Sequence, residues 1–222
     1  MYILNIETAT KNCSVALSKS GVLVGIREIA NEGYSHAEVL HVYIQEVLDE
    51  FGIKPAALSA VAVSRGPGSY TGLRIGVSAA KGLCFALGIP LLSTDTLLAM
   101  ASEITIKSGV ILPMIDARRM EVYSAIYAAN HNQIRGIEAQ ILHEDSFKDI
   151  DQTIYILGDC QEKVKTVLTD SKFVFVENVK YPSAKMMCEI SFKKFKNHEF
   201  EDLAYFEPLY LKDFLVLEKT KK

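Results

Sequence analysis

The stretch YILNIETATKNCSVALSKSGVLVGIREI, residues 2–29, decides the fold. It contains three short β-prone runs, Tyr2–Glu7, Ser14–Ser18 and Val22–Ile29, and the turn pair Ser20-Gly21 separates the last two. Three such runs joined by tight turns predict an antiparallel three-stranded meander. A Rossmann fold is less favoured, because its repeating unit begins with a parallel β-α-β crossover.

A helix and a buried strand are predicted after the meander. Ser35 and Glu38 form a capping box at the helix start, and Gly52 marks its end. The apolar residues between them recur at helical spacing and comprise Leu40, Tyr43, Ile44, Val47 and Phe51. The continuous apolar run Ala60–Val63 is typical of a buried parallel strand.

The second half of the chain repeats this order of elements. A second meander is predicted over Val110–Ile115, Glu121–Ala129 and Ile134–Leu142. Helix and strand patterns then alternate over Ser146–Ile150, Thr153–Leu157, Glu162–Leu168, Phe173–Val176 and Ser183–Lys196. This duplicated β-β-β-α-β-α order predicts an actin-like (ASKHA, ribonuclease-H-like) α/β fold. We expect two lobes, residues 1–103 and 104–222, with the last helix packing back on the first lobe.

Composition favours a folded protein that neither spans a membrane nor carries a signal peptide. Of the 222 residues, 49% are hydrophobic and 23% are charged. The N-terminus lacks a basic region, and no apolar stretch is long enough to cross a bilayer. The net charge of -3 disfavours a stand-alone nucleic-acid binder. The four cysteines form no C-x-x-C pair, which favours a reduced, cytoplasmic setting, and Cys84 is expected in the core.

The most informative segment is SRGPGSYTGLRIGVSAAKGL, residues 64–83. A phosphate-binding loop is one interpretation, but Gly66, Gly68 and Gly72 miss the dinucleotide spacing by one residue, and no Gly-Lys-Ser/Thr follows. In the helix that follows, Gly72, Gly76 and Ala80 fall four residues apart. A glycine inside a helix costs about 1 kcal/mol relative to alanine, so close packing should offset that cost.

Two interpretations of the small-residue helix remain open. It packs closely either against the chain's own sheet or against a helix of a second subunit. The amphipathic helix before it is the natural neighbour in the second case. The predicted partner interface then comprises Leu40, Tyr43, Ile44, Val47, Gly72, Ile75, Gly76, Ala79, Ala80 and Leu83.

Four blocks of the sequence, in order, carry a resemblance to a known family. Residues 64–83, followed by Gly88-Ile89-Pro90, resemble the long glycine-rich signature of TsaB/YeaZ proteins. Met114–Tyr123 resembles the family's second block, and Tyr34–Leu40 and Pro208–Leu211 resemble its H-S-E-x-L and P-x-Y-L stretches. One departure is visible: Glu7 stands where relatives usually have Asp.

The resemblance implies a non-catalytic subunit of a tRNA-modifying complex. That complex transfers a threonylcarbamoyl group to N6 of adenosine 37 in tRNAs reading codons that start with A. The implied partners are a TsaD-like catalytic subunit, which this chain would activate, a TsaE-like ATPase, and tRNA through the complex. The chain is expected to form a homodimer when alone. ATP or ADP and a metal are expected in partner subunits or at a subunit junction, with no intrinsic cofactor.

The resemblance also implies that this chain lacks a metal site and catalytic residues. The paralogue TsaD binds a metal through His-x-x-x-His, and alignment from Pro90 places Thr96 and Met100 at those two positions. Two histidines four residues apart on a helix can hold one ion. A hydroxyl and a thioether cannot replace them for a hard or borderline divalent ion. The absent pair also disfavours a peptidase.

An independent ATP-dependent phosphotransferase is the alternative hypothesis. Glu7 and Asp116 end the first strand of each half, and with Thr8 and Arg118 they could line a nucleotide cleft between the lobes. The simpler interpretation is that these carboxylates cap turns. Arg118 and Arg119 could bind phosphate or an acidic partner, or form a solvated surface pair.

Overall fold

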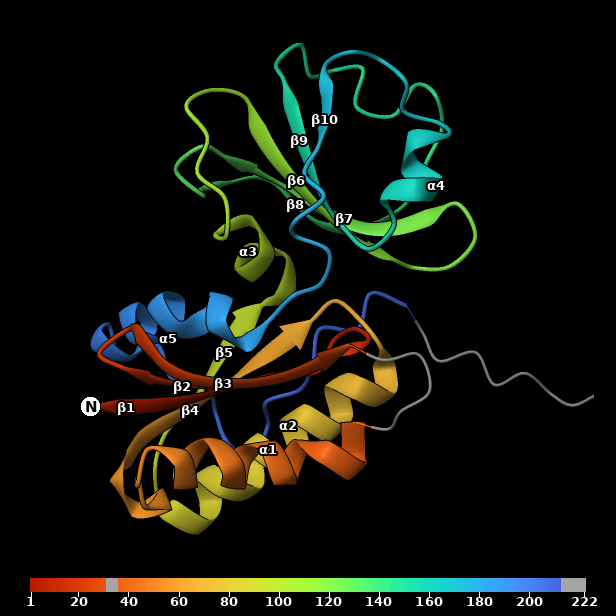
Figure 1. The fold of residues 1–222 in the computed structure, drawn as a ribbon. Coiled ribbons are helices and arrows are strands. Elements are labelled where there is room, and N and C mark those ends of the chain that lie inside the picture. Colours follow the sequence, from red (N-terminus) through yellow and green to blue (C-terminus); the bar gives the residue numbers. More distant parts are fainter. Residues whose placement is uncertain (31–35, 213–222) are drawn as a thin grey trace, which may run out of the picture.

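The first 30 residues fold as the predicted meander (Figure 1). The structure is a computed structural model and describes residues 1–30 and 36–212. Strands β1 (Tyr2–Glu7), β2 (Asn12–Lys19) and β3 (Val22–Ala30) pair antiparallel in order. Ser20 and Gly21, with φ of 53° and 86°, form the turn between β2 and β3. The predicted cap Ser35 lies outside the described residues.

Parallel strands extend the meander into the first-lobe sheet. After α1 (His36–Glu50) and η1 (Pro55–Ala57), β4 (Leu58–Gly66) pairs parallel with β1. Helix α2 (Tyr70–Leu87) leads into β5 (Leu91–Asp95), which pairs parallel with β4. The sheet order is therefore β3-β2-β1-β4-β5. The sequence patterns do not indicate β5, whose five residues include three polar ones.

The second lobe has the same sheet topology as the first. Its strands are β6 (Val110–Asp116), β7 (Glu121–Ala128), β8 (Gln133–Ile141), β9 (Ile154–Gly158) and β10 (Phe173–Phe175). Their order, β10-β9-β6-β7-β8, is that of the first sheet read from its other edge, and α4 (Gln161–Lys165) joins β9 to β10. The predicted duplicated, two-lobed actin-like plan is confirmed.

The predicted helix over Ser146–Ile150 is wrong. That segment forms successive tight turns, in which the amides of Ser146, Lys148 and Ile150 each donate to the carbonyl three residues earlier. Phe147 has a φ of 64°, which an α-helix does not accommodate, and its ring is buried in the second-lobe core. Burial of one aromatic ring therefore outweighs the weak helical preference of five residues.

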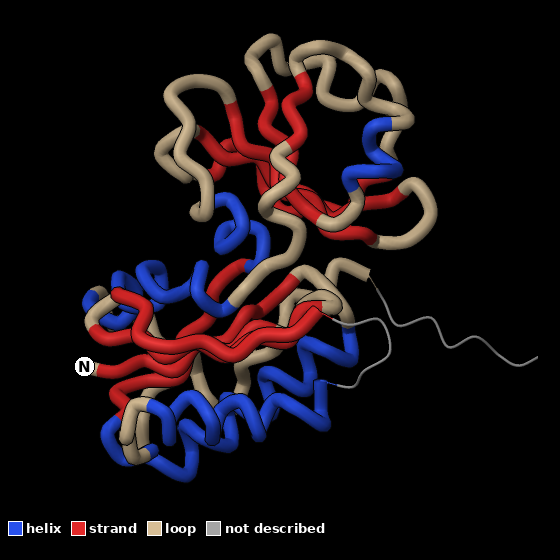
Figure 2. Tube along the Cα trace, viewed as in Figure 1, coloured by secondary structure: helices blue, strands red, loops and turns tan. Residues whose placement is uncertain are grey.

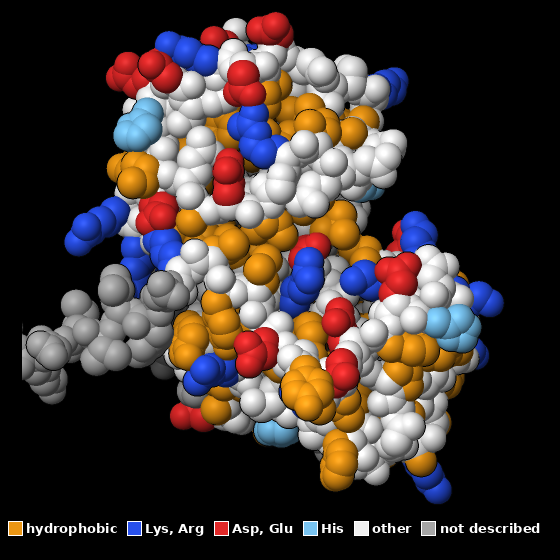
Figure 3. Space-filling view, turned by 180° about the vertical axis from the view of Figure 1, so that it is seen from behind, with side chains coloured by type: hydrophobic (Ala, Val, Ile, Leu, Met, Phe, Trp, Pro, Cys, Tyr) orange, Lys and Arg blue, Asp and Glu red, His pale blue; other side chains and the backbone are white. Residues whose placement is uncertain are grey.

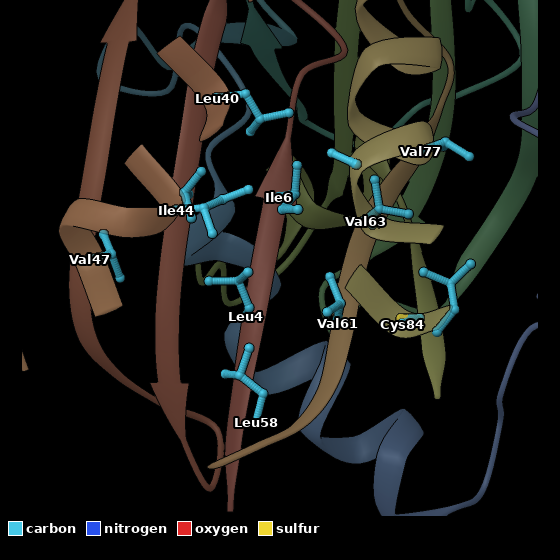
Figure 4. Close-up of a cluster of buried hydrophobic side chains, with 14 of the residues drawn as sticks. Leu4, Ile6, Leu40, Ile44, Val47, Leu58, Val61, Val63, Val77 and Cys84 are labelled. Atoms are coloured by element: carbon cyan, nitrogen blue, oxygen red, sulfur yellow. The ribbon is translucent and has the colours of Figure 1, made fainter. Parts of the chain in front are cut away.

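Helices cover both faces of the first-lobe sheet (Figure 2). Helices α1 and α2 cover one face, where side chains from β1, β4 and both helices meet in a core that includes Cys84 (Figure 4). The predicted helix over Ser183–Lys196 divides into η2 (Ala184–Met187) and α5 (Cys188–Lys196). Both pack on the opposite face, where Ser191 Oγ donates to Asn5 Oδ1 at 2.7 Å.

Helix α3 (Thr96–Ala101) lies between the two sheets. Its Leu97 and Met100 pack with Ile111 and Leu157 of the second sheet. The predicted boundary at residues 103 and 104 falls in the connection from α3 to β6 and stays a prediction. Within residues 1–30 and 36–212, the structure contains no helix long and apolar enough to cross a membrane.

The C-terminal segment, residues 201–212, returns along the first lobe and reaches the second. Its Glu201 amide donates to Leu91 O at 2.9 Å, and Lys81 Nζ donates to Ala204 O at 3.0 Å. The Leu209 amide donates to the carbonyl of Arg65 at 2.7 Å. Lys212 then forms an ion pair with Glu121 of β7. This segment therefore contacts both lobes.

Candidate functional site

The glycines of α2 are explained by contacts within the first lobe. A Cβ added to Gly72 would lie 2.1 Å from the carbonyl oxygen of Thr8, and one added to Gly76 would lie 2.3 Å from Thr8 Oγ1. That hydroxyl donates to Gly72 O at 2.8 Å. The close approach is therefore made by the residue following β1. For Gly72 and Gly76 no second subunit is needed to offset the cost of glycine.

Most of the predicted interface residues are buried in their own lobe. Tyr43, Ile75 and Leu83 are half-buried. The buried ones are Leu40, Ile44, Val47, Gly72, Gly76, Ala79 and Ala80. Six of them pack beneath the two helices, so they support the surface without being free to contact a partner, whereas Ala79 also lines the groove on the outer face. The expectation of a partner interface stays a prediction, and only the outer face of α1 and α2 can carry it.

That outer face contains a shallow groove of about 550 Å³. It is lined by Ala37, His41, Arg74, Ile75, Ser78, Ala79, Gly82 and Leu83. Phe85 is 83% exposed on α2 and Val42 is 50% exposed on α1. Figure 3 shows other hydrophobic side chains at the surface of the first lobe and at the junction of the lobes. We refer to the groove residues with Phe85 and Val42 as the helical face.

Gly82 differs from the other small residues of α2. A Cβ added there would meet no atom within 4 Å, because the position points away from the lobe. The fold therefore has no need for glycine at 82, although glycine weakens a helix interior. Gly82 follows exposed Ser78 by one turn, so the two form a low ridge along the helical face.

A second concavity, of about 920 Å³, lies between the lobes. The first lobe contributes the loop after β1 and the start of α2, and the second contributes the β6–β7 turn. The C-terminal segment closes one side with Tyr210, whose ring centroid lies 4.8 Å from that of Tyr70. The charged residues lining this interlobe cleft are Lys11, Asp116, Arg118, Arg119, Glu121, Asp159 and Lys212.

The structure does not bring the four predicted cleft residues together. Asp116 and Arg118 line the interlobe cleft, whereas Glu7 and Thr8 are fully buried and do not line it. Placing Glu7 and Thr8 in the cleft is therefore corrected. The phosphotransferase hypothesis depended on the pair Glu7 and Asp116 at the cleft, and it loses that basis because Asp116 lines the cleft and Glu7 does not.

Glu7 lies in a site that disfavours its charged form. Its Oε1 accepts hydrogen bonds from the Ala9 amide at 2.5 Å and from Ser64 Oγ at 2.9 Å. Its Oε2 has no hydrogen-bond partner among the described residues. Burial raises the pKa of Glu7 from 4.5 to about 7, against the opposing effect of these hydrogen bonds.

We expect Glu7 to make the protein less stable as pH rises from about 4.5 to about 7. Across that range the folded state holds a proton that the unfolded state has released, so the free energy of unfolding falls. The difference in pKa corresponds to about 3 kcal/mol. Urea denaturation at a series of pH values measures the loss. Glu7→Gln should remove this part of the pH dependence, whereas the exposed control Glu38→Gln should retain it. Equal slopes for all three proteins would contradict the assignment.

The positions aligned with the paralogue's metal ligands are enclosed. Thr96 begins α3 and Met100 lies one turn later, and both side chains are fully buried. In the part of the chain that the structure describes, no group of three or more His, Cys, Asp or Glu could hold a metal ion. The sequence patterns gave no indication of the C-terminal segment's role in the cleft, because its contacts there, such as that of Lys212 with Glu121, join residues 91 or more positions apart.

Two lobes of equal topology with a cleft between them define an actin-like protein. The family model described as tRNA N6-adenosine threonylcarbamoyltransferase matches residues 28–213. The chain is 30% identical to the tRNA threonylcarbamoyladenosine biosynthesis protein TsaB of Escherichia coli, over 99% of this chain and 98% of that protein. It is 29% identical to TsaB of Bacillus subtilis, over 77% and 76%.

The chain belongs to the TsaB/YeaZ family, which confirms the resemblance seen in its sequence. Its fold is also similar to that of YeaZ from Pseudomonas aeruginosa, with a TM-score of 0.82. The two sequences are 24% identical, and the match covers 95% of this chain and 99% of that one.

Proposed function

We propose that the protein is an accessory subunit in the biosynthesis of threonylcarbamoyladenosine in tRNA. It binds a TsaD-like catalytic subunit through the helical face and holds that subunit in its active arrangement. The observation that carries the proposal is the ridge of Ser78 and Gly82 beside exposed Phe85, because no contact within the described chain requires it.

The chemistry of the helical face suits a helix of a second subunit. Low side chains at Ser78 and Gly82 let a partner helix approach closely, which increases van der Waals contact. Complete burial of a phenylalanine contributes about 1.5–3 kcal/mol, so Phe85 could supply a central contact. A second copy of the chain presents the same face, so the protein forms a homodimer when the TsaD-like subunit is missing.

The rest of the proposed role follows from family membership. The complex transfers the threonylcarbamoyl group to N6 of adenosine 37 in the cytoplasm, and the catalytic metal resides in the TsaD-like subunit. This chain contributes no catalytic residue, since the aligned ligand positions hold buried Thr96 and Met100. It also helps to dock the TsaE-like ATPase and contacts tRNA through the complex.

Reconstitution tests this proposal. The purified chain, a TsaD-like subunit, a TsaE-like ATPase and a source of the activated threonylcarbamoyl group are combined with unmodified tRNA, and the modified nucleoside is measured. We expect no product when either this chain or the TsaD-like subunit is left out, and co-elution of the two in gel filtration. Full activity without this chain, or product formation by this chain alone, would refute the accessory role.

A further inference from the structure

The described part of the chain joins its two lobes at three places. Residues 102–109 lead from α3 to β6, and residues 176–183 lead back from β10 to η2. Both connections pack in one apolar cluster around α3, to which they contribute Ile104, Ile106, Val176 and Val179. Two connections packed side by side form a hinge, about which one lobe can rotate. The third junction lies elsewhere, where the end of the C-terminal segment reaches the β6–β7 hairpin (Figure 1).

The first lobe provides a shaped seat for this third junction. The Leu209 amide donates to Arg65 O at 2.7 Å, at the end of β4. The next residue, Gly66, has a φ of 108°, and a Cβ added to it would lie 3.0 Å from Leu209 O. Glycine adopts this backbone conformation readily, whereas residues with a side chain rarely do. Glycine at position 66 therefore allows the C-terminal segment to lie directly against β4.

Side chains of α2 hold the residue that follows this seat. The Tyr210 ring stacks on that of Tyr70, and the Tyr210 hydroxyl accepts a hydrogen bond from Arg74 Nε at 3.2 Å. The guanidinium carbon of Arg74 also lies 4.3 Å from the centroid of the Tyr70 ring. Arg74 therefore contacts both tyrosines. Because Arg74 is exposed, these contacts are weaker than the same contacts in a protein core.

Lys212 attaches the segment to the second lobe. Its Nζ forms an ion pair with Glu121, the first residue of β7, and donates to Ala117 O at 3.4 Å. It also lies 5.7 Å from the centroid of the Tyr123 ring. All three partners belong to the β6–β7 hairpin. Ion pairs between partly exposed side chains contribute little to stability, so this attachment can open while both lobes keep their own cores.

We propose that residues 207–212 form a latch that holds the two lobes at a fixed angle. With the latch closed, the seat at β4, the Tyr210 stack and the Lys212 ion pair connect the lobes at a point outside the α3 hinge. With the latch released, only the hinge connections remain, and the second lobe rotates away from the first. The equilibrium between the two forms depends on a few exposed contacts and not on either core.

The latch has an unexpected consequence for a residue of the helical face. Arg74 lies on α2 of the first lobe and lines the groove, yet it holds Tyr210 in place. Replacing Arg74 should therefore loosen the second lobe, although the substitution is made in the first. This inference does not depend on the proposed accessory role, because it can be measured on the chain alone.

The test measures the distance between the lobes by pulsed electron paramagnetic resonance of the full chain. Spin labels are placed on Glu38→Cys in α1 and Glu162→Cys in α4, both exposed positions, and the four native cysteines are buried. We expect one narrow distance distribution for the chain with an intact latch. The double variant Tyr210→Ala/Lys212→Ala should give a longer mean distance and a broader distribution. Arg74→Ala should shift both in the same direction.

Two control variants separate the latch from general loosening. Tyr205→Ala/Lys148→Ala removes an 85% exposed tyrosine of the same segment and an ion pair with Asp145 within the second lobe, and it should leave the distribution narrow. Tyr210→Phe/Lys212→Arg keeps the ring and the charge and should behave like the chain with an intact latch.

Three results would overturn the proposal. The first is an unchanged distance distribution in Tyr210→Ala/Lys212→Ala. The second is equal broadening in the Tyr205→Ala/Lys148→Ala control. The third is a loss of helical circular dichroism in Tyr210→Ala/Lys212→Ala together with the broadening, since residues 207–212 would then serve the folding of the first lobe and not the angle between the lobes.

Discussion

Replacing Gly82 by Trp is expected to weaken binding to the TsaD-like subunit strongly while the chain remains folded. The new side chain meets no atom of its own lobe near its Cβ, and tryptophan is a better helix former than glycine. The bulky indole ring would, however, stand above the low surface of Ser78 and Gly82 and keep a partner helix from approaching closely. We expect affinity to fall by at least about 100-fold, which corresponds to about 2.7 kcal/mol. Self-association should fall in parallel.

The measurement is titration calorimetry with the TsaD-like subunit, accompanied by circular dichroism and thermal unfolding. Gly136→Trp is the matched control, because Gly136 also has open space around its Cβ but lies on β8 of the second lobe. It should bind normally. A Gly82→Trp variant that folds and still binds with unchanged affinity would remove the helical face from the interface. Gly76→Phe is a poor probe for this purpose, because the added Cβ would already lie 2.3 Å from Thr8 Oγ1.

Gly72→Ala and Gly82→Ala, both in α2, should change the free energy of unfolding in opposite directions. Gly72→Ala forces a Cβ to within 2.1 Å of the Thr8 carbonyl oxygen, and both are backbone-anchored atoms that cannot rotate away. We expect the free energy of unfolding to fall by about 3 kcal/mol. Gly82→Ala meets nothing and removes the flexibility of glycine, so the free energy of unfolding should rise by about 1 kcal/mol.

Urea denaturation measures both changes, and a constant m-value shows that the midpoints report stability alone. The pair controls for helix propensity, since each variant makes the same substitution in α2. Destabilisation of similar size at both positions would contradict the assignment of Gly72 to the Thr8 contact. A fall in the free energy of unfolding for Gly82→Ala alone would indicate that Gly82, and not Gly72, lies on the inner face of α2.

The order of the helices and strands could be predicted from the sequence because it depends on local patterns. The two meanders, α1, α2 and the buried strand β4 each carry a clear periodicity, and their repetition indicated the two-lobed fold. Strand β5 escaped prediction because it contains three polar residues, of which Ser93 and Thr94 are buried by neighbours from distant parts of the chain. The prediction of a helix over Ser146–Ile150 failed because burial of Phe147 fixes a turn conformation that the local sequence preference does not favour.

The site was harder to predict than the fold. Spacing alone showed that Gly72, Gly76 and Ala80 share a face of α2. It could not show which face meets the core, because Thr8 reaches that helix from 64 positions earlier in the sequence. For the same reason, Glu7 looked like a cleft residue although it is buried. Arg118 lines the cleft, and its assignment to a nucleotide site stays a prediction.

The chain's last elements complete its first lobe, and this constrains how the chain can fold during its synthesis on the ribosome. One face of the β1–β5 sheet lacks its cover of η2 and α5, and β5 and α2 lack their contacts with residues 201–212, until these segments emerge from the exit tunnel. Vectorial synthesis therefore cannot finish the amino-terminal half before the carboxyl-terminal half exists. Nascent chains stalled near residue 103 should recruit chaperones and be readily proteolysed, whereas release of the finished polypeptide should end both.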